Sequence, residues 1–235
     1  VKMNEFMRDK QMILNTAQDY DHMQSTGQYE PGKVPKFEAW DWFMLKAIII
    51  QFLWRNPQQD KIKIVDVGCG PGHDMVVFKE YLQEQGFKGN IEIEGCDISE
   101  EMVNSAREKG LNVVQADYRD QEFTDMLSDA DIVWSDLSLI HLPLNEVDES
   151  FRLLFNLAKP GGLVGVGLKS GNDETKMEVK NRGDSSADYS RLTTYYSEGR
   201  VRELFNRNDC SIIYYANLPH KSGRYYDYFW IFGIK

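Results

Sequence analysis

The chain of 235 residues is poor in cysteine and in basic residues, and both shortages narrow the classes of protein to which it can belong. Its three cysteines, Cys69, Cys96 and Cys210, are widely spaced, and none forms a C-x-x-C pair. We therefore expect reduced thiols, with neither a disulfide framework nor a metal site. Acidic residues outnumber basic ones by 37 to 27, which gives a net charge of −10. This balance argues against a nucleic-acid partner, because such partners are bound through clustered lysine and arginine.

Long apolar runs are scarce as well. Residues 39–54 could be mistaken for a membrane span, but they include Asp41, Lys46 and Gln51. The stretch is also shorter than the roughly 20 residues that cross a bilayer, so we predict a core helix over 37–55. The first residues are rich in charge and amide groups, unlike a signal peptide. We expect a cytoplasmic protein with no membrane partner.

The rest of the chain is organised around a glycine-rich stretch, Val65-Asp66-Val67-Gly68-Cys69-Gly70-Pro71-Gly72-His73-Asp74. An apolar run over 62–67 precedes it, and residues 75–82 carry apolar side chains at helical spacing. A strand, a glycine turn and a helix form the first half of a βαβ unit. Such a turn lets a ligand approach bare backbone, and the free N–H groups of the helix N-terminus face it.

Three kinds of nucleotide site compete for this turn. A dinucleotide-binding turn requires G-x-G-x-x-G, but His73 occupies the place of the third glycine. A phosphate-binding P-loop requires G-x-x-x-x-G-K-[ST], and the near match at 27–34 lacks the Ser or Thr and is followed by Pro35. The spacing Asp66-x-Gly68-x-Gly70-x-Gly72 instead resembles the first motif of the class I S-adenosylmethionine-dependent methyltransferases. The resemblance implies that the turn, Cys69 included, packs against the methionine part of the cofactor. It also implies that Asp66 holds the amino group of the cofactor, directly or through water.

Acidic residues follow the next two predicted strands. Asp97 comes directly after the strand 91–95, where a carboxylate can accept hydrogen bonds from a ribose diol, and Ile98 is then expected against the adenine. The alternative is that Asp97 only caps the next helix, for which Ser99 is a good N-cap. Asp117 and Tyr118 follow the strand 112–116. In the family, an acid here accepts a hydrogen bond from the adenine amino group, and Tyr118 could stack on or edge the ring; a solvated turn acid is the alternative.

The fourth predicted strand, 131–135, runs into Asp136-Leu137-Ser138-Leu139-Ile140-His141-Leu142-Pro143. This segment resembles the fourth motif of the same family, where the chain passes between cofactor and substrate. Asp136 and Leu137 are therefore expected at the cofactor, although Asp136 could equally be a structural turn acid. His141 is the candidate general base; alternatively it contacts the cofactor or is bonded at the start of the next helix, predicted over 144–159.

The C-terminal part completes the predicted sheet. Lys159-Pro160-Gly161-Gly162 leads into the apolar strand 163–168, and strands at 210–215 and 226–234 follow a helix at 198–208. We predict an α/β fold: a Rossmann-like, seven-stranded, mostly parallel sheet with an antiparallel C-terminal hairpin and helices on both faces. This fold is what the resemblance implies, and it covers 61–235.

Two polar segments flank this domain. Residues 1–60 are predicted as an N-terminal helical segment, with a helix at 4–18, that caps the active site; 19–36 are predicted as a loop. Tyr20 and Tyr29 are the aromatic candidates to face the cleft, unless they only pack a surface segment. The polar stretch 169–194 is predicted as a loop that serves as a lid or binds substrate. Arg191, Tyr195 and His220 are candidates to bind an acidic or aromatic group of the acceptor.

The sequence therefore predicts a methyltransferase that uses S-adenosyl-L-methionine to methylate O, N or S of a small molecule, as a monomer or a homodimer. No Asn-Pro-Pro-Tyr element follows the strand 131–135, which, with the acidic charge, points away from DNA. A protein or peptide methyltransferase and a non-catalytic S-adenosylmethionine-binding module remain alternatives. A nicotinamide oxidoreductase is disfavoured by His73 and by the predicted C-terminal hairpin.

Overall fold

The computed structural model describes residues 17, 18, 20–22, 25, 38–120, 126–180, 189–218 and 228–235. The helices are α2 (Glu38–Arg55), α3 (His73–Glu84), α4 (Glu100–Glu108), η1 (Leu139–His141), η2 (Leu144–Glu146), α6 (Val147–Leu157) and α7 (Glu198–Arg207). The strands are β1 (Lys61–Val67), β2 (Asn90–Asp97), β3 (Asn112–Gln115), β4 (Ala130–Asp136), β5 (Ala158–Lys169), β6 (Glu174–Lys180), β7 (Tyr189–Tyr195), β8 (Ser211–Leu218) and β9 (Tyr228–Ile234).

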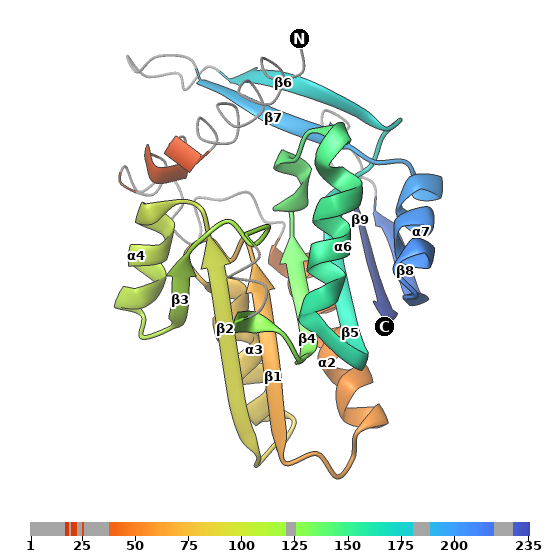
Figure 1. Cartoon of the computed structure of the whole chain (residues 1–235). Coiled ribbons are helices and arrows are strands. Elements are labelled where there is room, and N and C mark those ends of the chain that lie inside the picture. The colour runs from red at the N-terminus through yellow and green to blue at the C-terminus, as the bar shows by residue number, and fades with distance from the viewer. Residues whose placement is uncertain are drawn as a thin grey trace.

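Seven strands form one twisted sheet in the order β3-β2-β1-β4-β5-β9-β8 (Figure 1). The first five strands in this order, from β3 to β5, are parallel to one another. Strand β9 is antiparallel to both β5 and β8. The predicted Rossmann-like sheet and its antiparallel C-terminal pair are confirmed. Between β1 and β4 the strand order reverses direction, and ligands of open α/β sheets bind at the carboxyl ends of strands at such a point.

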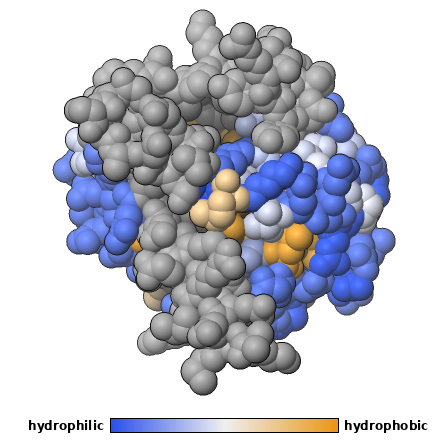
Figure 2. All heavy atoms as spheres, turned by 90° about the horizontal axis from the view of Figure 1, so that it is seen from above, coloured by the Kyte–Doolittle hydropathy of each residue, from blue (hydrophilic) through white to orange (hydrophobic). Residues whose placement is uncertain are grey.

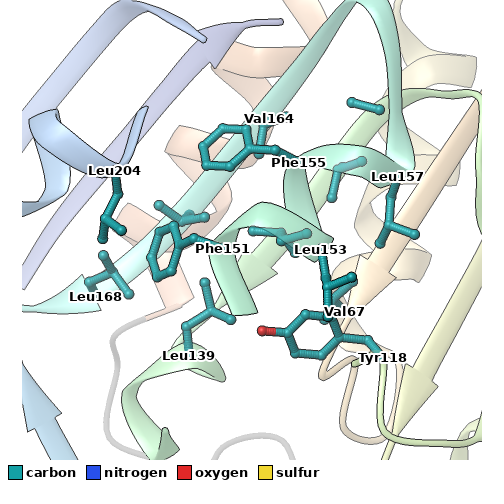
Figure 3. Packing of buried hydrophobic residues seen from close by; sticks show 14 of the residues in the cluster. Val67, Tyr118, Leu139, Phe151, Leu153, Phe155, Leu157, Val164, Leu168 and Leu204 are labelled. Atoms are coloured by element: carbon teal, nitrogen blue, oxygen red, sulfur yellow. The ribbon is translucent and has the colours of Figure 1, made fainter. Parts of the chain in front are cut away.

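Alternating side chains on β1 build a core on each face of the sheet. Ile62 and Ile64 pack with α2 and α3, while Val65 and Val67 face the opposite way toward α6. On the α6 side, Phe151 and its neighbours fill the space between the helix and the sheet (Figure 3). Because both faces are covered, the strands of the centre are nearly continuous apolar runs, as parallel sheets require.

The junction between α6 and β5 differs from the prediction. The helix predicted over 144–159 begins at Val147, after the short helix η2, and ends at Leu157. Residues 159–162 lie inside β5, which pairs with β4 through a register shift between Ala130 and Ile132. Gly161 adopts a φ of +80°, so the glycines accommodate an irregularity within the strand rather than a helix end.

The segment 169–194 is not the predicted loop. Its two described halves form the antiparallel strand pair β6–β7, which lies above the carboxyl ends of the main sheet (Figure 1). The strand β7 is polar on one face and packs on η1 with the other, where Leu192 is 1% exposed. Arg191 and Thr193 on its polar face are buried as well, so the stretch reads as polar although β7 is covered on both faces.

The predicted N-terminal helix 4–18 lies almost entirely outside the described residues, as do Tyr29 and His220. Tyr20, predicted in a loop, is helical, as are its neighbours Asp21 and His22. Among the described residues, no helix is long and apolar enough to cross a membrane. Seen from the carboxyl end of the sheet, the visible described surface is mostly hydrophilic, with small apolar patches (Figure 2).

Candidate functional site

A cavity of about 270 Å³ lies at the carboxyl ends of β1, β2 and β4. Arg191, a predicted acceptor contact, lines it, as do ten of the thirteen residues predicted for cofactor binding and catalysis: Tyr20, Gly68, Gly70, Asp97, Ile98, Asp117, Tyr118, Asp136, Leu137 and His141. The other three, Asp66, Cys69 and Gly72, do not. The cavity also takes in residues that the sequence did not single out: Cys96, Met102, Ala116, Arg119, Ser138, Leu139, Ile140, Leu142, Lys169, Glu178, Thr193 and Tyr228.

The glycine turn after β1 is fastened to the end of β2. The N–H groups of Gly68 and Cys69 both donate to the carbonyl oxygen of Cys96, over 2.8 and 2.9 Å. Gly68 has a φ of +72°, and a Cβ added to it would lie 2.0 Å from the Ser138 hydroxyl oxygen. Gly70, with a φ of +51°, has no atom of the described residues within 4 Å of an added Cβ. The turn therefore leaves bare backbone and open space at Gly70, beside the cavity.

Gly72 has a packing role. It ends the turn as the N-cap of α3 with a φ of +79°. A Cβ on it would lie 2.2 Å from Leu111 Cδ1, which belongs to the core cluster beneath α4. The third glycine of the motif is thus required by helix packing, and it faces away from the cavity wall.

Asp97 joins the glycine turn to the start of α4. One carboxylate oxygen accepts the N–H of Gly70 and the other accepts the N–H of Ser99, each over 2.9 Å. Ser99 is the predicted N-cap, and its hydroxyl accepts the N–H of Met102. Burial raises the pKa of Asp97, and the two backbone N–H groups oppose that rise. A carboxylate has about four acceptor positions, so this one can still accept hydroxyl groups of a ligand in the cavity.

The two residues predicted at the adenine have protein partners of their own. The guanidinium of Arg119 binds both carboxylate oxygens of Asp117, with its Nε 2.8 Å from Oδ1, and also pairs with Glu146. The ring of Tyr118 is buried in the core beneath α6, and its hydroxyl donates to the carbonyl oxygen of Ser150 over 3.2 Å (Figure 3). Arg119 therefore lines the cavity beside Asp117, and only part of the Tyr118 ring faces the cavity.

Three carboxyl groups, those of Asp66, Asp74 and Asp136, belong to the cavity floor or the layer beneath it. The indole N–H of Trp230 donates to Asp136 over 2.9 Å, and that of Trp134 donates to Asp74 over 2.8 Å. Burial, with the charge of Asp74, raises the pKa of Asp136 to about 8, against the stabilising hydrogen bond from Trp230. Burial also raises the pKa of Asp66 well above its usual value, and the charges of its aspartate neighbours add to this.

Asp66 itself is 2% exposed and does not reach the cavity wall. Among the described residues its Oδ2 has no hydrogen-bond partner. Leu137, directly after Asp136, has a φ of +52°, which is unusual for a branched side chain. Such conformations concentrate at ligand sites.

The other end of the cavity is built around His141. Its Nδ1 lies 2.7 Å from the carbonyl oxygen of Leu192, and its Nε2 lies 2.9 Å from the hydroxyl of Tyr20. The guanidinium of Arg191 lies 4.3 Å from the centre of the Tyr20 ring. Next to Tyr20, the carboxylate of Asp21 accepts the hydroxyl of Ser99 over 2.5 Å and the N–H of Glu101 over 3.1 Å. Tyr195, another predicted acceptor contact, is fully buried and does not line the cavity.

The order of the strands, the glycine turn and the acid at the end of β2 define a Rossmann-like domain of the class I methyltransferase type. Residues 64–162 match a family model described as a methyltransferase domain. Over this range the chain is similar to methyltransferase domains.

Curated relatives agree over part of their length. The chain is 36% identical over 120 residues to trans-aconitate 2-methyltransferase of Mycobacterium tuberculosis, which is 51% of this chain and 41% of that protein. It is 33% identical over 111 residues to the putative methyltransferase YqeM of Bacillus subtilis, with 45% and 41% covered. The chain thus matches less than half the length of these relatives.

Solved structures agree over most of the chain. A 1,6-didemethyltoxoflavin-N1-methyltransferase of Burkholderia thailandensis superposes with a TM-score of 0.62 at 14% identity, covering 94% of this chain and 88% of that one. The magnesium protoporphyrin IX methyltransferase of Synechocystis superposes with a TM-score of 0.61 at 18% identity, covering 94% and 99%. At such low identities the likeness establishes the fold.

Proposed function

We propose that the protein is an S-adenosylmethionine-dependent methyltransferase that methylates O, N or S of a small molecule. The observation that carries the proposal is one cavity with two different ends. The exposed backbone of Gly70 and the carboxylate of Asp97 lie at one end, and His141 lies at the other. Structures with the same fold contain S-adenosylmethionine or its product, S-adenosylhomocysteine, and the curated relatives include methyltransferases of a small carboxylic acid.

The residues at the first end suit this cofactor. Asp97 would accept the ribose hydroxyls, and Ile98 and Met102 would flank the adenine. Among the described residues that line this end, the acids Asp97 and Asp117 outnumber the one cation, Arg119. An acidic surplus fits a ligand that carries a sulfonium and an ammonium group. Asp66, buried beneath, has an oxygen that lacks a described partner, and burial raises the pKa of its carboxyl.

When bound, S-adenosylmethionine supplies a methyl group on a sulfonium, which is transferred in line to the acceptor while the sulfur takes the electron pair of the broken C–S bond. The task of the chain is then mainly alignment and exclusion of water, which can supply several kcal/mol of the barrier, up to roughly 7–11. His141 is the candidate to take a proton from an acceptor that arrives protonated. Tyr20 and the residues next to it would cap the reacting groups.

Two features support a small acceptor over a peptide. The cavity is small, about 270 Å³, and Tyr20 and the pair β6–β7 contribute to its wall. The strand pair stands where a loop was predicted over 169–194. A non-catalytic binding module would have the same cofactor-binding residues, so only a measurement of methyl transfer distinguishes it from an enzyme. Cytoplasmic location and a monomeric or homodimeric state stay predictions.

Calorimetric titration tests the cofactor. The wild type should bind S-adenosylmethionine with micromolar affinity and should not bind NAD. Asp97→Ala should weaken binding about tenfold or more, and Asp97→Asn, which preserves side-chain volume, should weaken it in the same direction, since each loses charge-assisted hydrogen bonds. Asp60→Ala, an exposed acid before β1, is the matched control and should bind like wild type. Absence of S-adenosylmethionine binding, or equal binding by the Asp97 variants, would overturn the proposal.

A further inference from the structure

A charged pair, Asp117 and Arg119, lines the cofactor end of the cavity just beyond the carboxyl end of β3. In the sheet register Gln115 of β3 is the partner of Asp97, the last residue of β2. The N–H of Ala116 then donates to the carbonyl oxygen of Asp97 over 3.0 Å. The charged pair therefore lies one strand further from the glycine turn than the carboxylate that is expected at the ribose.

This place suits the adenine ring of the cofactor. The glycine turn follows β1, Asp97 ends β2 and the charged pair follows β3, and these strands are neighbours in the sheet. Neighbouring strands are about 4.8 Å apart, so a ligand with its ribose at Asp97 and its methionine part at Gly70 extends its base toward β3. The apolar side chains of Ile98, Met102 and Ala116 line the same end of the cavity. In such a slot a few polar groups fix the orientation of a flat ring.

The guanidinium of Arg119 is fixed by two carboxylates from different elements. Its Nε donates to Oδ1 of Asp117 over 2.8 Å, and its Nη2 donates to Oδ2 of the same carboxylate. Its Nη1 donates to the carboxylate of Glu146, the last residue of η2. Paired contacts of this kind hold the guanidinium plane in one orientation.

The described contacts leave hydrogen-bonding capacity on both members of the pair. An arginine has five N–H groups, and three of those of Arg119 are used, so one remains on each terminal nitrogen. A carboxylate has about four acceptor positions. Oδ1 of Asp117 accepts the main-chain N–H and the Nε–H of Arg119, whereas Oδ2 accepts one N–H.

Because Oδ2 of Asp117 and Nη2 of Arg119 are bonded to each other, the remaining acceptor and the remaining donor stand side by side. The two side chains are 27% and 20% exposed, so a ligand in the cavity can reach them. The edge of an adenine ring has the complementary arrangement, since its 6-amino group is a donor and the adjacent ring nitrogen N1 is an acceptor.

We propose that Arg119 is a specificity-determining residue that recognises the adenine of S-adenosylmethionine by donating an N–H of Nη2 to ring nitrogen N1, while Asp117 accepts the 6-amino group. This inference rests on the proposed function. The ion pair with Glu146 then orients the donor before the cofactor binds, which lowers the cost of ordering it.

Calorimetric titration with analogues that lack one ring nitrogen tests this inference. The ligands are S-adenosylhomocysteine and its 1-deaza and 3-deaza forms, in which a C–H group replaces N1 or N3. The wild type should bind the 1-deaza form about tenfold or more weakly than S-adenosylhomocysteine, because a hydrogen bond from a charged donor is lost and the donor is left without its partner.

Variants of Arg119 locate the donor. Arg119→Met keeps an apolar stem and should no longer distinguish S-adenosylhomocysteine from the 1-deaza form, with affinities within about twofold of each other. Its ratio of affinities for S-adenosylhomocysteine and the 3-deaza form should stay near the wild-type ratio. Arg119→Gln, a milder change, should lose the 1-deaza ratio as well. Arg152→Met removes an exposed arginine that pairs with Glu149 on α6; it is the matched control and should behave like wild type.

Each ratio compares two ligands of the same protein, so partial unfolding of a variant does not alter it. Equal binding of S-adenosylhomocysteine and its 1-deaza form by the wild type would overturn the inference, as would a 1-deaza ratio that persists in the Arg119 variants. An equal change of the 3-deaza ratio would overturn it too, by assigning Arg119 a general role in holding the site. All these results leave the proposed function intact, whereas a wild type that binds neither S-adenosylmethionine nor S-adenosylhomocysteine would overturn the proposed function itself.

Discussion

The imidazole of His141 is held between the hydroxyl of Tyr20 and the main-chain carbonyl of Leu192. Because a carbonyl oxygen can only accept, the Nδ1 atom that lies 2.7 Å from Leu192 carries the hydrogen. In the neutral ring Nε2 is then an acceptor, and the hydroxyl of Tyr20 donates to it over 2.9 Å. The basic nitrogen of His141 is therefore oriented toward the segment that Tyr20 belongs to, and the ring is fixed by the backbone of β7.

This arrangement predicts different effects for the two residues. His141→Gln should lower kcat by roughly 10²–10⁴, the usual contribution of a general base, with a smaller change in KM. Tyr20→Phe removes the competing donor and leaves the base in place, so kcat should stay within a few-fold of wild type. Steady-state assays with a small-molecule acceptor that the protein methylates would measure both.

The pH dependence of kcat distinguishes a general base from a residue that only positions other groups. Wild-type kcat should fall at acidic pH, and that limb should be absent from the residual activity of His141→Gln. Equal losses of kcat in the two variants, or a residual activity with an unchanged profile, would assign His141 a positioning role.

A second prediction concerns the stability of the protein against pH. Because burial raises the pKa of Asp136 to about 8, its carboxyl is protonated in the folded chain at neutral pH, whereas in the unfolded chain it ionises near its usual 3.8. Folding therefore takes up a proton between these two values. The free energy of unfolding should fall as pH rises through that window, by up to about 1.4 kcal/mol per pH unit for one group.

Asp136→Asn isolates this effect, because the amide is neutral at every pH and its oxygen can still accept the indole N–H of Trp230. The variant should be about as stable as wild type near pH 4 and progressively more stable toward pH 8, the pKa of the buried carboxyl. Urea denaturation at one-unit pH intervals measures the difference. Parallel stability curves for the two proteins would show that Asp136 is ionised in the folded state.

The glycine turn yields a matched pair of variants. Gly72→Ala should destabilise the fold by about 1–3 kcal/mol, through a strained backbone and a clash with Leu111, while the folded protein keeps its affinity for S-adenosylhomocysteine. The methyl group added by Gly70→Ala contacts no described atom, so this variant should cost only about 1–2 kcal/mol of backbone strain. Its affinity for S-adenosylhomocysteine should nevertheless fall about tenfold or more, because the methyl group lies in the space of the cofactor. Urea denaturation and calorimetry separate the two effects. The opposite pattern would mean that Gly72 and not Gly70 faces the cofactor.

The cofactor end could be predicted because its residues follow strands directly. Asp97 and Asp136 are the last residues of the parallel strands β2 and β4, and the carboxyl ends of parallel strands meet at one edge of the sheet. The ion pair between Asp117 and Arg119 could also be predicted, because the two residues are only two positions apart in the sequence. Burial of the Tyr118 ring beneath α6 depends on tertiary packing and cannot be predicted from the neighbouring residues in the sequence.

The acceptor end could not be predicted in the same way. Thr193 and Glu178 belong to strands whose outward sequence is polar, and their approach depends on a register between segments separated by residues 181–188. Lys169 lies at the end of an apolar strand, where position alone does not distinguish a ligand contact from a solvated lysine. Arg191 was singled out for an acidic ligand, whereas Tyr195, singled out with it, supports Glu178 from outside the cavity.

Tyr20 and Asp21 are adjacent in the chain, yet they bind opposite ends of the cavity. Tyr20 contacts His141 and Arg191, whereas Asp21 binds Ser99 and Glu101 at the start of α4, beside Asp97. Lifting this short stretch breaks both sets of contacts together. If the protein acts as proposed, the exchange of spent cofactor and the release of methylated product would be linked through one opening step. The rate of that step would then set an upper limit on turnover, however fast the methyl group is transferred.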